Sequence, residues 1–438
     1  MSHAVSDREP SMWKPVLTGL AGASIEWYDF FLYGVAAALV FPALYFPNTL
    51  PPAVAMLASF STFAVGFFAR PVGAMLFGHF GDRAGRKSAL VAALVLMGMA
   101  TTVIGCLPSY ATIGPWAPAL LVLCRFLQGL AIGGQWGGAM LLIVESAPPH
   151  RRGYYGSFTQ VGAPAGVVLA NLAFLIMSAL TSREAFLAWG WRVPFLFSVV
   201  LVVLAAWVHQ RVAETPAFAA LRAAPASAVV RTRSPILEVL STQPRKILLA
   251  AGAFLAVQVS FYISITFVVA YASKLSGLAI PERTMLTGVL ISSAVMAPAL
   301  VWCGALSDRF GRQTIYRAGS LLMAAWAFVM FPLIETGSLL WITVAVTVSL
   351  TLNGMMYGPQ AVLFSELFAT RVRYSGASLG YQLGAMCGGG LSPLIATWLY
   401  GRYHGTVAIS AYMAAACLTT FVCVALLGRT APPAADAA

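Results

Sequence analysis

The chain has 438 residues, of which 60% are hydrophobic and only 9% are charged. Soluble domains carry about 25% charged residues, so the composition excludes a soluble fold and indicates a polytopic membrane protein. The net charge of +12 is explained by basic residues in cytoplasmic loops, and we expect no binding of nucleic acid.

Apolar stretches recur along the whole chain, and a helical span needs about 20 mostly apolar residues. No period-2 alternation typical of barrel strands is present, so the prediction is an all-α protein. Turn signals such as Pro51-Pro52, Pro148-Pro149 and Pro281 separate the apolar stretches. Twelve spans are predicted, at about 14–42, 52–78, 88–108, 116–145, 154–181, 190–210, 245–273, 285–306, 314–333, 338–366, 374–400 and 406–428.

Basic residues fix the expected orientation, because they accumulate in cytoplasmic loops. With the N-terminus in the cytoplasm, most Lys and Arg fall in inner segments, so both termini are expected to be cytoplasmic. A polar stretch rich in Ala, Pro and Arg divides the chain into halves, with a short helix expected near 234–238. The predicted organisation is a tail 1–13, a six-helix bundle 14–210, a linker 211–244, a six-helix bundle 245–428 and a tail 429–438.

An internal repeat supports this division. Residues 78–87, after the second span, and residues 304–313, after the eighth, share the pattern G-x-x-x-D-R-x-G-R-[KQ]. Residues 137–145 align with 358–366, and each of these stretches ends in a glutamate. Homologous halves are typical of transporters that bind their substrate near the bilayer midplane, between the halves.

The repeated loops predict a gate at the cytoplasmic side. We expect Arg86 and Arg312 to pair with Glu145 and Glu366, and the loop aspartates to face helix N-termini, where negative charge is favoured. The alternative is that these charges are only topology signals in short loops. The gating candidates are Asp82, Arg83, Arg86, Glu145, Asp308, Arg309, Arg312 and Glu366.

Four charged residues lie deep inside predicted spans: Glu26, Asp29, Arg70 and Arg125. Charges at such depth are costly and mark function by default. Counted at about 1.5 Å per helical residue, Asp29 and Arg125 lie at similar depth, whereas Arg70 lies nearer Glu26. Because the four charges sum to zero, we expect mutual pairing.

Several stretches together resemble one transporter family: "EWYDFFLYG" (26–34), "ARPVGAMLFGHFGDRAGRK" (69–87), "RFLQGLAIGGQWGG" (125–138), "WGWRVPFLFS" (189–198) and "RVRYSGASLGYQ" (371–382). They are similar to the metabolite–proton symporter family of the major facilitator superfamily, which includes shikimate, α-ketoglutarate, citrate and proline/betaine transporters. The resemblance implies twelve helices in two pseudo-symmetric six-helix bundles. The chain departs from the usual "GGEWGG" at Gln135, which removes a carboxylate.

For proton coupling, Asp29 is the main candidate for carrying the proton, with Arg125 as its switchable partner and Glu26 as a less certain second carboxylate. The resemblance supports this, since related proton-coupled sugar porters pair an aspartate of span one with the arginine of an R-x-x-Q-G motif, here Arg125, Gln128 and Gly129. A static ion pair that orients spans one and four is the alternative.

For substrate binding, Arg70 either binds a substrate carboxylate, which suits the planar guanidinium, or pairs with Glu26. Other polar side chains among the apolar runs could line a cavity or make plain helix contacts. They are Tyr33, Gln128, Gln135, Trp136, Gln160, Asn171, Gln258, Tyr262, Asn353, Tyr357, Gln360, Tyr381 and Gln382.

The predicted function is proton-coupled symport of a small organic acid, shikimate-like or a di- or tricarboxylate, across the inner membrane by alternating access. The predicted partners are the acid, protons and the bilayer, and the chain is expected to be a monomer. An efflux antiporter, a betaine or proline transporter, and a sensor or scaffold are the alternatives. No metal site, cofactor or enzyme activity is expected, because the histidines and cysteines are scattered and no nucleophile–base pair is evident.

Overall fold

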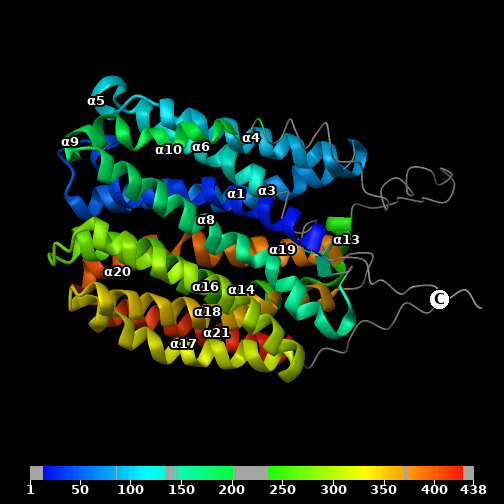
Figure 1. Ribbon diagram of the computed structural model, residues 1–438. Coiled ribbons are helices and arrows are strands. Elements are labelled where there is room, and N and C mark those ends of the chain that lie inside the picture. The colour runs from blue at the N-terminus through cyan, green and yellow to red at the C-terminus, as the bar shows by residue number, and fades with distance from the viewer. Residues whose placement is uncertain are drawn as a thin grey trace, which may run out of the picture.

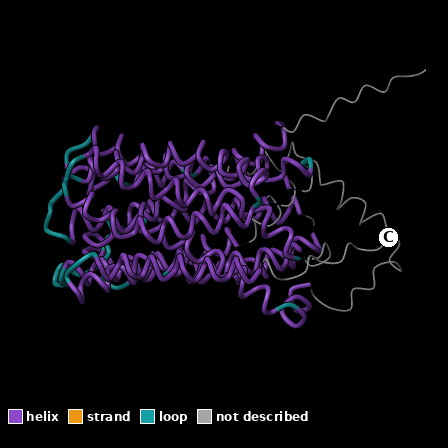
Figure 2. Tube along the Cα trace, turned by 90° about the horizontal axis from the view of Figure 1, so that it is seen from below, coloured by secondary structure: helices purple, strands orange, loops and turns teal. Residues whose placement is uncertain are grey.

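The computed structural model describes residues 13–84, 86–133, 147–200, 235–368 and 373–427, together with 140, 143, 144 and 203. Within the described helices, the side chains of some residues also fall outside the description, among them those of Glu26, Asp82, Arg83 and Arg86. The described residues form helices and connecting turns without a strand, and the connections lie at the two ends of the helices (Figure 2).

The first half consists of helices that follow the predicted spans closely. Because each expected span is continuously apolar, its backbone groups are satisfied within one helix. The helices are α1 (Trp13–Leu39), α2 (Phe41–Leu44), α3 (Pro52–Ala84), α4 (Arg86–Cys106), α5 (Tyr110–Ile113), α6 (Trp116–Gly133), η1 (Pro149–Arg151), α8 (Arg152–Leu180), α9 (Arg183–Ala185), η2 (Phe186–Gly190) and α10 (Arg192–Phe197).

The second half repeats this arrangement after a short helix, α13 (Pro235–Thr242), which lies where the sequence predicts one. Two of its spans contain π-helical turns, η4 to η6, of a kind often found at functional sites. The elements are α14 (Pro244–Tyr262), η4 (Ile263–Phe267), α15 (Val268–Ala270), η5 (Tyr271–Leu275), α16 (Glu282–Phe310), α17 (Arg312–Glu335), α18 (Leu339–Leu367), α19 (Arg373–Ala385), η6 (Met386–Gly390), α20 (Ser392–Tyr403) and α21 (Val407–Leu427).

Eight helices in the described part of the chain are long and apolar enough to cross a membrane. The other four expected spans correspond to α1, α4, the segment from α9 to α10, and the segment from α19 to α20. The turn between α16 and α17 is made by Gly311 with φ of 89°, a backbone conformation that favours glycine. Gly311 belongs to the repeated loop motif, which explains why that motif contains a glycine before its last arginine.

The two halves pack side by side, with the helices from α1 to α10 in one bundle and those from α14 to α21 in the other (Figure 1). Across the boundary, α8 packs against α16 and α18. On the other side of the centre, α3 packs against α19, η6 and α20, while α1 touches η4 and α15. Residues that project inward from α1, α3 and α14 therefore lie where the halves meet.

Glycines allow α3 and α6 to approach each other closely. A Cβ atom on Gly129 of α6 would collide with the backbone carbonyl oxygen of Gly66 in α3, and one on Gly133 would collide with the carbonyl oxygen of Arg70. Small residues at helix contacts are typical of membrane bundles, where backbones must approach for good packing. The glycines thus fix the position of the inward-facing residues of both helices.

We expect Gly129→Ala to destabilise the fold by about 1–3 kcal/mol, because the added methyl group meets a backbone oxygen that cannot rotate away. The measurement is thermal unfolding of the purified protein in detergent. Gly401→Ala in α20 is the matched control, since a Cβ there meets nothing within 4 Å. Equal melting temperatures for the two variants would contradict the packing interpretation.

Candidate functional site

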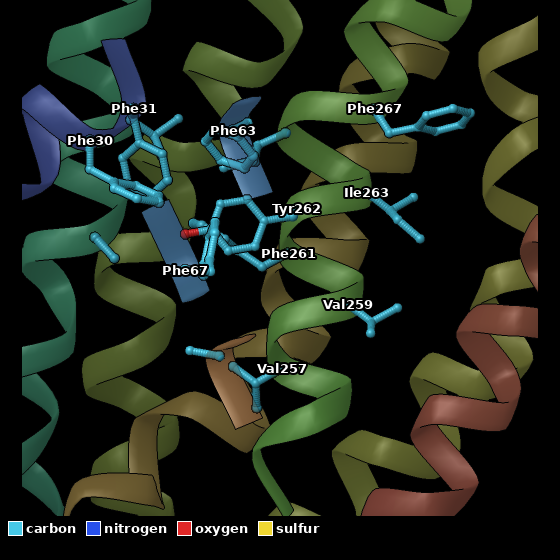
Figure 3. Close-up of a cluster of buried hydrophobic side chains, with 14 of the residues drawn as sticks. Phe30, Phe31, Phe63, Phe67, Val257, Val259, Phe261, Tyr262, Ile263 and Phe267 are labelled. Atoms are coloured by element: carbon cyan, nitrogen blue, oxygen red, sulfur yellow. The ribbon is translucent and has the colours of Figure 1, made fainter. Parts of the chain in front are cut away.

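An aromatic cluster occupies the centre of the molecule, where the halves meet. Phe30 and Phe31 of α1, Phe63 and Phe67 of α3, and Tyr262 at the end of α14 converge there, as Figure 3 shows. The rings of Phe30 and Phe67 meet edge to face with centroids 5.2 Å apart, and those of Phe67 and Tyr262 do the same at 5.2 Å. This geometry is favourable for aromatic pairs. The cluster joins both halves through side chains.

Two arginines are buried against this cluster, and both are 0% exposed. The guanidinium carbon of Arg70 lies 4.5 Å from the ring centroid of Phe30 and 4.2 Å from that of Phe67. The guanidinium carbon of Arg125 lies 4.1 Å from Phe30 and 4.6 Å from Phe63. Aromatic faces attract cations, so these rings offset part of the cost of burying the charges.

None of the three guanidinium nitrogens of Arg70 makes a well-aligned hydrogen bond to a described residue, although the hydroxyl of Tyr262 lies close enough to interact with it. No ion pair to it is present in the described part of the chain, and Arg125 is a like charge close enough to interact with it. A buried guanidinium without an anion is costly. The arrangement suits a ligand carboxylate, which could accept two parallel bonds from Arg70. The sequence also predicts a pair between Arg70 and Glu26, but the structure does not describe the side chain of Glu26.

The expected direct pair between Asp29 and Arg125 is not present in the described ion pairs. Asp29 is fully buried and accepts a hydrogen bond from Ser198 Oγ at 2.6 Å, with Thr101 as a second hydroxyl neighbour. Arg125 donates instead to Gln128 Oε1 at 3.1 Å, and Gln128 Nε2 donates to Thr101 Oγ1 at 2.7 Å. The guanidinium of Arg125 does not reach Asp29 because aromatic faces and the side chain of Gln128 hold it elsewhere. Thr101 and Gln128 thus connect the carboxylate with the guanidinium.

Some of the expected lining residues already have partners within the protein. Tyr33 donates to Thr62 Oγ1 at 2.7 Å, and Asn171 donates to the carbonyl oxygen of Val167. Asn353 Nδ2 donates to the carbonyl oxygen of Val257 at 2.7 Å, which links α18 to α14. With Gln128, these residues make the plain helix contacts that the sequence left open as an alternative.

Other expected lining residues are buried with polar atoms that no described residue bonds. These are both amide atoms of Gln160 and of Gln360, Nε2 of Gln258, Oε1 of Gln382 and the hydroxyl of Tyr262. The hydroxyls of Tyr357 and Tyr381 lie 3.4 Å apart, and Arg70 interacts electrostatically with Tyr262 and Tyr357. Buried polar groups normally have partners, so these atoms suit contact with a polar ligand, and Tyr262 and Tyr357 are two of these residues that interact with Arg70. Gln135 and Trp136 lie outside the described residues.

The pair expected between Arg312 and Glu366 is present, with Nη1 and Oε1 2.5 Å apart. Asp308 accepts hydrogen bonds from the backbone N–H groups of Gly153 at 2.8 Å and Tyr154 at 2.9 Å, at the N-terminus of α8. An aspartate in the last turn of α16, in the second half, therefore caps a helix of the first half. Arg309 takes no part in this network and lies over the ring of Phe310.

The corresponding candidates of the first half cannot be placed. Asp82, Arg83 and Arg86 belong to helices whose side chains are outside the description, and Glu145 lies outside the described residues.

At the opposite end of the bundles, the halves are joined by a lysine that the sequence did not single out. Lys274 at the end of η5 donates to the carbonyl oxygen of Leu39, at the end of α1, at 2.6 Å. The same ammonium lies 3.6 Å from a carboxylate oxygen of Glu282. The halves are thus in contact at both ends of the molecule.

Other contributors that sequence reasoning missed are hydroxyls and rings. Ser198 and Thr101 carry no charge, and their positions beside Asp29 arise from the packing of α10 and α4 around α1. Phe30 and Phe67 are indistinguishable by sequence from packing residues. The only available signal is that Phe30 directly follows Asp29 in the chain.

Comparison with known proteins gives the family. Residues 16–431 match the profile of the family described as "Sugar (and other) transporter". The chain belongs to this family, within the major facilitator superfamily. It is 41% identical over 423 residues to "Inner membrane metabolite transport protein YhjE" of Escherichia coli (strain K12), covering 95% of this chain and 94% of that protein. It is 40% identical over 422 residues to "Shikimate transporter" of the same strain, covering 94% of each.

A more distant relative is "Proline/betaine transporter" of Salmonella typhimurium, 33% identical over 401 residues, covering 88% of this chain and 77% of that protein. Among solved structures, the xylose transporter XylE from E. coli in a partially occluded inward-open conformation gives a TM-score of 0.72 at 18% identity. The match covers 96% of this chain and 98% of that chain.

These findings confirm the predicted fold: an all-α protein with twelve membrane helices in two six-helix bundles. The protein is a membrane transporter of metabolites and not an enzyme, since its family and its relatives are transporters.

We expect Asp308→Ala to expose the N-terminus of α8, because two backbone N–H groups lose their acceptor. Hydrogen exchange measured by mass spectrometry should become faster in peptides that contain Gly153 and Tyr154. Arg309→Ala is the matched control, because the neighbouring Arg309 lies over the ring of Phe310 and makes no hydrogen bond to these amides among the described residues, so they should stay protected. Unchanged exchange in the Asp308 variant would show that the cap does not hold this helix end.

Proposed function

We propose that the protein is a proton-coupled symporter that imports a small organic acid across the inner membrane by alternating access, as a monomer. The observation that carries this proposal is the fully buried guanidinium of Arg70, which has no anionic partner among the described residues. The names of the relatives, which include a shikimate transporter and an inner membrane transport protein, support an organic solute and this membrane.

The charge balance of the site favours an anion. Two guanidiniums lie within mutual electrostatic range at the aromatic cluster, and the carboxylate of Asp29 is ion-paired with neither among the described residues. A substrate carboxylate would restore neutrality and satisfy Arg70. The amides and tyrosine hydroxyls nearby suit hydroxyl groups on the substrate, as on shikimate, whereas a di- or tricarboxylate could use both guanidiniums.

A zwitterion such as betaine or proline is the second candidate, since one relative is named for proline and betaine. Aromatic faces could bind its cationic end. However, guanidiniums already face the rings of Phe30, Phe63 and Phe67. Two guanidiniums already lie at this cluster and would repel a further cation, so we favour an acid.

For the proton, we propose that Asp29 binds and releases it, while Thr101 and Gln128 communicate the change to Arg125. Asp29 is the described carboxylate that lies in the centre of the membrane-spanning region. Burying a charged group there is costly, and such a group therefore marks function by default. The Oδ2 atom of Asp29 makes no well-aligned hydrogen bond to a described residue, although the hydroxyl of Thr101 is nearby, and this oxygen could carry the proton. The second candidate, Glu26, remains a proposal from the sequence alone.

For alternating access, we propose that contacts at the two ends open in turn. The end that bears Asp308, Arg312 and Glu366 is assigned to the cytoplasm, because basic residues accumulate there. The bond from Lys274 to Leu39 closes the opposite end. Each conformational change would then exchange polar contacts at one end for polar contacts at the other.

Uptake into proteoliposomes tests the function. With an inward proton gradient, the protein should accumulate a labelled acid from a panel of shikimate, α-ketoglutarate and citrate, with proline and betaine as the zwitterion arm. Accumulation driven by an outward gradient would indicate an antiporter, and gradient-independent equilibration would indicate a uniporter. No uptake of any panel member under any gradient would overturn the proposal.

In the same assay, we expect Asp29→Asn to abolish gradient-driven accumulation while exchange of labelled for unlabelled substrate persists. The amide keeps the shape and an acceptor for Ser198 but cannot take up a proton. Normal accumulation by this variant would exclude Asp29 as the proton carrier. Ser182→Asn, an exposed change in the turn before α9, is the control for the substitution itself.

We expect Arg70→Lys to raise the substrate Kd by roughly 10- to 100-fold, because lysine cannot donate two parallel bonds to a carboxylate. Isothermal titration of the purified protein measures this change. Arg402→Lys, an exposed position at the end of α20, should bind like the unmodified protein. An unchanged Kd for the Arg70 variant would remove Arg70 from the substrate site.

A further inference from the structure

The ring of Phe30 is shared by the two buried guanidiniums. Its centroid lies 4.5 Å from the guanidinium carbon of Arg70 and 4.1 Å from that of Arg125. The other rings each face one cation only: Trp27 and Phe67 contact Arg70, whereas Tyr33 and Phe63 contact Arg125. Among the described rings that contact an arginine, Phe30 is thus the one that contacts two.

We propose that Phe30 couples the substrate site to the proton site. The proposal rests on the proposed function, in which Arg70 binds the substrate carboxylate and Arg125 responds to Asp29. A ring attracts a cation through its negative faces, and two cations that share one ring also repel each other. When a substrate carboxylate draws Arg70 away from the ring, the position of lowest energy for Phe30 and Arg125 changes as well.

A displacement of Phe30 acts directly on the proton-carrying group, Asp29. Phe30 follows Asp29 directly in α1, so a shift of the ring and its backbone moves the carboxylate relative to Ser198 and Thr101. Coupling of two sites is reciprocal, so protonation of Asp29 also changes the affinity for the substrate.

Among the described residues, few charged or titratable side chains lie around Phe30. Arg70 approaches from α3, Arg125 from α6, and the ring of Tyr262 from α14 at 6.2 Å between centroids. Asp29 is the adjacent residue in α1, and the side chain of Glu26, about one turn earlier, is outside the description.

The experiment measures the coupling factor, defined as the ratio of substrate Kd values at a mildly alkaline and a mildly acidic pH. The full-length protein in lipid nanodiscs is titrated with shikimate, or with the panel acid that the uptake assay identifies. The variants are Phe30→Leu and two matched controls, Phe67→Leu and Phe63→Leu, each of which removes a ring that faces one arginine only.

For the unmodified protein, we expect a coupling factor of about 5 to 150, the range usual for coupled sites. Phe30→Leu should reduce it to within about twofold of one, while Phe30→Tyr restores it, because the aromatic face returns. Phe67→Leu should weaken binding at both pH values and keep the ratio. Phe63→Leu should likewise keep the ratio. A coupling factor that Phe30→Leu leaves unchanged, or that all three leucine variants reduce equally, would overturn the proposal.

Fluorinated phenylalanines at position 30 keep the test decisive where Phe30→Leu does not fold. Stepwise fluorination weakens the negative ring face without removing the ring, so the coupling factor should fall with each added fluorine. A factor independent of fluorination would show that Phe30 only fills space. Failure of the proposed function is distinguishable, because the unmodified protein would then show no gradient-driven uptake.

Discussion

Two buried guanidiniums that pair with no anion among the described residues are the constraint around which the centre of this transporter is organised. Arg70 and Arg125 lie against aromatic faces, and Arg125 also donates to the side chain of Gln128 and to the carbonyl oxygen of Phe63. These neutral groups attract the cations without neutralising them. Rings cannot donate or accept the hydrogen bonds that a guanidinium needs, so part of the burial cost remains. That remaining cost favours binding of an anion, and it makes the site sensitive to any change in nearby charge.

Helix α1 carries a buried carboxylate, a ring of the aromatic cluster and a contact with the second half. Within two successive residues it presents Asp29 to Ser198 and the ring of Phe30 to both arginines. Its end at Leu39 also accepts the bond from Lys274 of the second half. A small rotation or shift of this one helix therefore alters the carboxylate, the aromatic cluster and the closure at one end together.

The fold was predictable because span length and apolar continuity are imposed by the bilayer, and the basic loops divide the chain into halves. The pair of Arg312 with Glu366 and the capping role of Asp308 were also predictable, because complementary charges recur at repeated positions. The arrangement around Asp29 was not. Equal depth in the membrane does not fix the direction in which a side chain points, and Arg125 is turned toward Gln128 and aromatic rings.

The contact between α8 and α16 brings the two halves together backbone to backbone. A Cβ atom on Gly153 would lie 2.5 Å from the carbonyl oxygen of Gly304, and one on Gly304 would lie 2.6 Å from that of Gly153. The backbones approach so closely here that the side chain of Asp308 reaches the amide groups of Gly153 and Tyr154 directly. A side chain at either glycine would push the two helices apart, so these bonds between the halves depend on two residues that carry no side chain.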